Sequence, residues 1–191
     1  MSLVDRSKEL LSEPRYRIAL YDLLSQELRR VAGETTENEF PVSERDVSSR
    51  TLADRLNRYE EVTSDLRQSA ACIAFWGESI HWDSLAAIHA RLPDRLKGRD
   101  GLVVWLALRW YPSILVFYSS GIAAVAAKKY DNLARIFDTK VVGPDNHQGR
   151  VPLVYAMSKV MVELERANVF KSLPGHEKQL TPRSEYLFKR F

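Results

Sequence analysis

The sequence predicts an all-α protein, an irregular bundle of about seven or eight helices in one domain spanning residues 1–191. In nearly every periodic segment the apolar residues recur at three- and four-residue steps, which is the helical period. No segment sustains the alternation of apolar and polar residues that marks a half-buried strand. With 191 residues, 45% of them hydrophobic, the chain can build one core without disulfides or structural metals.

Residues 1–13 are expected to carry a short, loosely attached helix over 3–11. A second helix is predicted over 14–32, because Pro14 suits the first turn of a helix. Its apolar stripe consists of Ile18, Tyr21, Leu24, Leu28 and Val31. Gly33 is expected to end this helix as a C-terminal cap, and a polar surface loop follows.

The longest helix is predicted over 48–76, with Gly77 ending it. Its apolar residues keep three- and four-residue steps at Leu52, Leu56, Tyr59, Leu66, Ala70 and Ile73. A shorter helix over 83–92 follows, which Asp83 can cap and Pro93 bounds.

Residues 102–128 are the expected core, a pair of helices that are hydrophobic on nearly every face. The run is long enough to span a membrane, but Arg109 lies within it and Pro112 divides it. Pro112 suits the first turn of a new helix. The sequence therefore predicts two buried helices meeting at Pro112, and no membrane partner.

Beyond this pair, the pattern predicts further helices separated by an irregular stretch over 138–151. They run from Asp131 to Phe137, from Pro152 to about residue 170, and from Thr181 to Phe191. The valines of the irregular stretch are too few to predict a strand.

Basic residues are concentrated in the C-terminal half of the chain. The first hundred residues carry a net charge of −3 and the remainder a net charge of +6. A basic half can bind nucleic acid or an acidic partner. Because the Lys and Arg residues are scattered rather than clustered, nucleic-acid binding through residues 128–190 is kept only as a third hypothesis.

The chain has one cysteine, Cys72, which lies in an apolar helical run without a basic neighbour in sequence. We expect it to be a buried small hydrophobe rather than a nucleophile. A single unpaired cysteine and the absence of a visible signal peptide indicate a reducing, cytoplasmic location.

The sequence predicts no catalytic residue, no metal and no cofactor. Glu78 and His81 have the Glu-x-x-His spacing of di-iron bundles, but the chain holds one copy and Gly77 is expected to end the helix before it. A histidine near Glu78 and Asp83 would have a raised pKa and could act as an acid. The favoured interpretation is structural, with Asp83 capping a helix and Trp76 and Trp82 covering a loop.

Arg109 stands between Leu108 and Trp110 in a very apolar helix. A buried arginine needs a carboxylate or carbonyl partner. We expect a structural ion pair, in preference to an anchor for a partner or an anion.

Three segments together resemble the helical region that follows an N-terminal effector domain in some large bacterial proteins. They are Arg15–Leu24 (RYRIALYDLL), Trp105–Tyr118 (WLALRWYPSILVFY) and Leu180–Phe188 (LTPRSEYLF). The effector domains of such proteins are sirtuin-like or Toll/interleukin-receptor-like NAD-cleaving folds, or other domains expected to act against phage. The resemblance covers about residues 14–191. It implies that the chemistry belongs to the effector domain, so no catalytic residue carries over to this chain.

The ends of the chain are consistent with a piece excised from such a protein. The start Met1-Ser2-Leu3 resembles a vector-derived sequence, and the last helix presents Tyr186, Leu187 and Phe191 for a partner to cover. The alternative is a complete small protein whose last helix docks on its own core.

Three functions follow as hypotheses. The first is a non-enzymatic helical module that packs against an effector domain, a partner protein or a second copy in a homodimer. The second is a small-ligand-binding or enzymatic domain. Its pocket would be lined by Trp76, Trp82, Trp105 and Trp110, with polar groups from Glu78, His81 and Arg109. The third is the nucleic-acid binding mentioned above.

Overall fold

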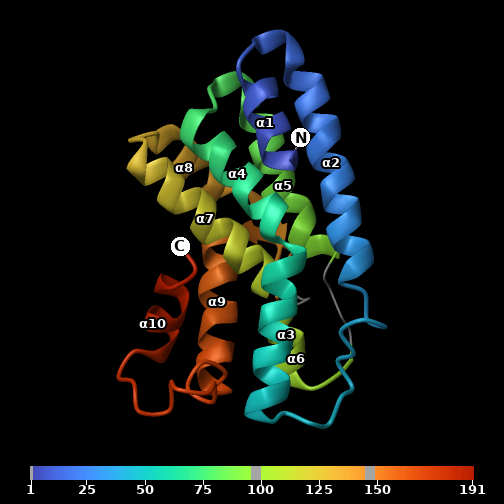
Figure 1. Ribbon diagram of the computed structural model, residues 1–191, viewed down its shortest axis with the longest axis vertical. Helices are drawn as coiled ribbons and strands as arrows, with labels where there is room; N and C mark the ends of the chain where they lie inside the picture. The colour runs from blue at the N-terminus through green and yellow to red at the C-terminus, as the bar shows by residue number, and fades with distance from the viewer. Residues whose placement is uncertain (1, 96–99, 145–148) are drawn as a thin grey trace.

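The computed structural model describes residues 2–95, 100–144 and 149–191, and in these ranges it is an α-helical bundle with one small sheet (Figure 1). The helices are α1 (Leu3–Leu11), α2 (Arg17–Glu34), α3 (Ser49–Val62), α4 (Ser64–Trp76), α5 (Trp82–Arg95), α6 (Val103–Leu108), α7 (Tyr111–Ala126), α8 (Tyr130–Asp138), α9 (Leu153–Arg166) and α10 (Pro182–Phe188). Short 3-10 turns, η1 (Pro14–Tyr16) and η2 (Ser79–His81), precede α2 and α5. The predicted all-α class is confirmed.

The N-terminal helix α1 is packed into the bundle. Ser2 and Asp5 form a reciprocal capping box that starts the helix. The helix lies against α4 and α2 and buries Ser7 completely. Helix α1, predicted to be loosely attached, therefore packs as an integral element of the upper half of the molecule in Figure 1.

Helix α2 extends beyond its predicted end. Gly33 lies inside the helix, where it was predicted as a cap, and the hydroxyl of Thr35 donates to Val31 O at 2.6 Å in the last turn. The buried stripe also differs from the predicted one, because Ile18 is 66% exposed. The residues that α2 buries are Leu20, Leu23, Leu24, Glu27, Leu28 and Val31.

The helix predicted over 48–76 is two helices, α3 and α4, which meet at Thr63. The Thr63 hydroxyl donates to Tyr59 O at 2.7 Å, a back-bond that bends helices. Gly77 ends α4 as predicted. A Cβ at Gly77 would lie 2.3 Å from Ile73 O, so only glycine fits this close turn.

The predicted pair of buried helices over 102–128 is present as α6 and α7, and Pro112 lies in the first turn of α7. Helix α7 makes its most extensive contacts with α4. The fully buried Ala70 and Ala74 of α4 and Ala124 of α7 allow close approach. In the ranges that the structure describes, no helix is both long enough and apolar enough to cross a membrane.

Part of the stretch predicted as irregular is a β-hairpin. Strand β1 (Lys140–Val142) pairs antiparallel with β2 (Arg150–Pro152), with Val141 opposite Val151. Val141 is fully buried, and β1 packs against α5. The hairpin therefore extends the bundle beside α5.

Helix α10 docks on the core of its own chain, beside α9 in Figure 1. Tyr186 and Leu187 are buried, so the prediction that they await a partner is wrong. Phe191 stacks on Tyr118 of α7 with ring centroids 5.9 Å apart. The last helix therefore covers the core of its own chain.

Candidate binding groove

The four tryptophans do not share a pocket, because each is held by different neighbours. Trp105 is fully buried and donates from Nε1 to Glu44 O at 2.8 Å. Trp110 is buried in the core, whereas Trp76 is 52% exposed at the end of α4. Helices α4 and α6 lie in opposite halves of the molecule in Figure 1. The Trp-lined pocket with Glu78, His81 and Arg109 is therefore not formed.

Trp82 belongs to a structural polar cluster. Its Nε1 donates to Asn132 Oδ1 at 2.7 Å, and the Arg135 guanidinium lies 4.5 Å from the centroid of its ring. Asn132 Nδ2 in turn donates to Ala74 O at 3.0 Å and to Gly77 O at 3.1 Å. These bonds tie α8 to the end of α4 and the start of α5.

Glu78 and His81 also have structural roles. The Glu78 N–H donates to His81 Nδ1 at 3.1 Å, and the Glu78 carboxylate pairs with Lys129. The hydrogen bond from Lys129 lowers the pKa of Glu78, and burial lowers the pKa of His81. The expected raised histidine pKa is wrong, because desolvation outweighs the nearby carboxylate. Within residues 2–95, 100–144 and 149–191, no three His, Cys, Asp or Glu side chains converge on a possible metal position.

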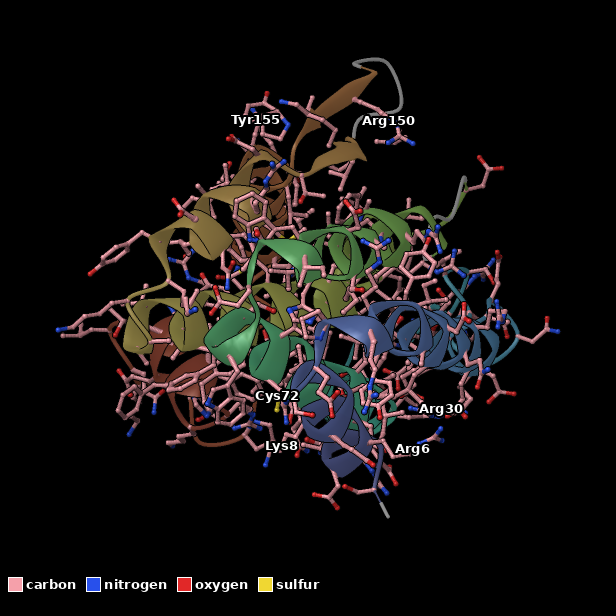
Figure 2. The ribbon with its side chains drawn as sticks, turned by 90° about the horizontal axis from the view of Figure 1, so that it is seen from above. Arg6, Lys8, Arg30, Cys72, Arg150 and Tyr155 are labelled. Atoms are coloured by element: carbon pink, nitrogen blue, oxygen red, sulfur yellow. The ribbon has the colours of Figure 1, made fainter. Side chains whose placement is uncertain are left out.

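Cys72 is buried, as predicted, and burial raises the pKa of its thiol. The ammonium group of Lys8, on α1, acts in the opposite direction on this pKa. Figure 2 labels both side chains on the α1 side of the molecule. A buried thiol with a raised pKa is a poor nucleophile.

Arg109 is only 4% exposed, and its Nη2 lies 3.9 Å from the carboxylate of Glu37. Its Nε and Nη1 have no hydrogen-bond partner in the described part of the chain. The Glu37 side chain is 60% exposed, so the carboxylate of this long ion pair is solvated. The predicted ion pair is therefore present, and its carboxylate lies at the surface.

Arg55 is also buried, and its polar contacts are shorter than the ion pair of Arg109. Its Nη2 donates to Pro41 O at 3.0 Å and to the Glu44 carboxylate at 2.7 Å. Its guanidinium lies 3.9 Å from the centroid of the Trp105 ring. We call residues 35–48, which join α2 to α3, the strap. Arg55 therefore holds the strap against α6.

The different surroundings of Arg55 and Arg109 predict different losses of stability when each is replaced by methionine. Arg55→Met is expected to lower the free energy of unfolding by about 2 kcal/mol, because it removes two charge-assisted bonds and a ring contact. Arg109→Met is expected to change it by less than about 1 kcal/mol, because Glu37 stays solvated when its partner is lost. Urea denaturation of both variants checks the difference. Equal losses in the two variants would contradict it.

A groove of about 810 Å³ lies between α2, α5, α8 and the β-hairpin. Its basic lining residues are Arg17, Arg91, Arg135, Lys140 and Arg150, and its acidic ones are Asp83 and Asp138. Figure 2 shows Arg150 at the hairpin. We call this feature the cationic groove. Its excess of basic over acidic groups gives it a positive potential.

The cations of the groove differ in how firmly they are placed. The Arg91 guanidinium donates to the Tyr21 hydroxyl and lies over its ring, and Arg135 lies over Trp82. Arg17 and Lys140 form no side-chain ion pair with any carboxylate that the structure describes. The groove thus combines fixed guanidinium groups with charges available to a ligand.

Small apolar side chains line the α5 side of the groove. Helix α5 contributes Ala86, Ala87 and Ala90, which leave room for side chains of a ligand to approach its backbone. Ile18 and Ile80, both exposed, flank the floor. Sequence reasoning missed this site because its cations come from distant segments. The one local signal is the run of alanines on a helix face that is not fully buried.

Comparison of the chain with protein-family models, with curated proteins and with solved structures finds no match. The resemblance to helical regions that follow effector domains therefore stays a prediction.

Proposed function

We propose that this chain is a non-catalytic helical interaction module that binds an acidic segment of a partner polypeptide. The cationic groove is the observation that carries the proposal, because Arg17 and Lys140 in its lining form no ion pair with any carboxylate in the described ranges. The effector domain of a parent protein, a separate partner and a second copy of this chain are the partners that the sequence predicts. The positive charge of the groove adds that any of these partners would present an acidic segment.

The lining of the groove favours a polypeptide over nucleic acid. Asp83 and Asp138 would repel a phosphate backbone but can receive a basic side chain of a mixed-charge segment. The aromatic lining residue, Tyr21, is covered by Arg91, whereas single strands need open rings for base stacking. The alanine floor suits apolar side chains of a helix.

The test is the binding of a fluorescein-labelled acidic peptide of about 20 residues, with Glu and Leu repeating at helical spacing. Fluorescence anisotropy measures its affinity. The Arg17→Glu/Lys140→Glu double variant is expected to bind at least about tenfold more weakly than the wild type, because two attractions become repulsions. Its matched control is Arg29→Glu/Lys159→Glu, which makes the same charge change on exposed residues outside the groove. The control should stay within about twofold of the wild type.

Equal affinity of the double variant and its control would refute the proposal. A single-stranded DNA of similar length serves as the competing ligand. If it binds more tightly than the peptide and loses affinity in the same double variant, the groove is a nucleic-acid site instead.

A further inference from the structure

A second, smaller depression lies beside the exposed tryptophan. It has a volume of about 340 Å³ and is lined by Lys8, Leu11, Ser12 and Trp76. We call it the Trp76 slot. Lys8 Nζ lies 5.7 Å from the centroid of the Trp76 ring and forms no ion pair with any residue described in the structure. The slot therefore combines apolar side chains with one cation in its lining.

The Trp76 slot lies close to the cationic groove. Trp76 lines the slot and Ile80 lines the groove, and four residues of chain span at most about 14 Å. On the neighbouring segment, Ser12 lines the slot and Arg17 lines the groove, with the compact turn η1 between them. The segments that separate the two depressions lie at the upper end of the molecule in Figure 1.

We propose that the Trp76 slot and the cationic groove form one bipartite site for a single partner segment. This inference rests on the proposed function. The segment places a large apolar side chain, next to a carboxylate, in the slot and lays its acidic stretch along the groove. The carboxylate meets Lys8, and the apolar side chain covers the exposed face of Trp76.

Two physical arguments support an anchor at this position. A half-exposed indole keeps much apolar area in water, and binding that covers it is favourable. Tryptophan is also among the residues that most often dominate binding energy at interfaces. The positive charges at both depressions require the same sign of charge from the partner, which explains why one acidic segment suits both.

Two acidic peptides without tryptophan test the inference. They are identical except that one carries a phenylalanine anchor and the other an alanine at the same position. Acrylamide quenching of protein fluorescence reports on Trp76, because Trp105 and Trp110 are buried and Trp82 is half-buried. We expect the phenylalanine peptide to bind about tenfold more tightly than the alanine peptide and to reduce quenching.

Trp76→Ala should reduce the affinity for the phenylalanine peptide to that for the alanine peptide and leave the latter unchanged. Lys8→Glu should weaken the binding of the phenylalanine peptide more than that of the alanine peptide. Phe188→Ala, which removes another highly exposed aromatic side chain, is the control and should have no effect.

The outcomes separate this inference from the proposed function. If both peptides bind the wild type equally, depend on Arg17 and Lys140, and leave quenching unchanged, the bipartite site is wrong and the groove function stands. If the phenylalanine peptide protects Trp76 without depending on Arg17 and Lys140, the slot acts alone and the inference is also wrong. If neither peptide binds, the proposed function fails.

Discussion

Replacing Glu60 with alanine is expected to lower the free energy of unfolding by about 3 kcal/mol and to release α10 from the bundle. Glu60 Oε1 accepts from the Tyr111 hydroxyl at 2.8 Å, the Tyr186 hydroxyl at 2.9 Å and Arg190 Nε at 3.0 Å. Burial, reinforced by the Glu60 charge, raises the pKa of Tyr186. Burial also raises the pKa of Tyr111, so both phenols are neutral donors, and both lose the carboxylate that accepts from them in the variant.

Urea denaturation and hydrogen exchange of residues 182–191 measure this effect. Glu61→Ala removes the neighbouring carboxylate, which forms no ion pair in the described structure, and should change the stability by less than about 0.5 kcal/mol. Glu60→Gln keeps an acceptor for the tyrosines and should fall between the two. Slow exchange in α10 of the Glu60→Ala protein would show that apolar packing alone holds this helix.

Acidification is expected to destabilise the protein through His89, by about 3 kcal/mol near pH 4. Burial in α5 lowers the pKa of His89 to about 3, from an ordinary value of 6.5 that the unfolded chain retains. Between these two pH values the unfolded chain binds a proton that the folded chain does not. The stability contributed by neutral His89 is therefore complete above about pH 6.5 and is lost as the pH falls toward 3.

The difference between wild type and His89→Met isolates this effect, because carboxylate titrations are common to both proteins. Chemical denaturation at a series of pH values gives the free energy of unfolding of each. We expect the wild type to lose stability relative to His89→Met as the pH falls from about 6.5. A difference that is independent of pH would mean that His89 is solvated in the folded protein.

Much of the fold could be predicted from the sequence, because a single proline or glycine sets some of the helix boundaries. Pro112 fixes the start of α7 and Gly77 the end of α4, and both act through the backbone. Thr63 was missed because the apolar period continues across it and only its side-chain hydrogen bond marks the break. The hairpin was missed because strands of three residues show no alternation.

Site residues were harder to predict than helices, because their partners come from distant segments. The burial of Arg109 follows from its apolar neighbours in sequence, but its exposed partner Glu37 does not. The grouping of Arg17, Arg91 and Lys140 around one groove is a property of tertiary packing alone. Periodicity assigns a residue to a face of its helix and leaves open which other helix meets that face.

The contacts of Glu60 also have a consequence for synthesis on the ribosome. Glu60 bonds to Tyr186 and Arg190, which follow it by 126 and 130 residues. Helices α1, α2, α4 and α5 contact one another over shorter separations and can assemble while the chain is still growing. Closure of α10 against α3 and α7 has to wait until Arg190 has left the exit tunnel. Cotranslational folding is therefore expected to begin in the upper half of the bundle, and the bonds of Glu60 to α10 are expected to form after those helices have assembled.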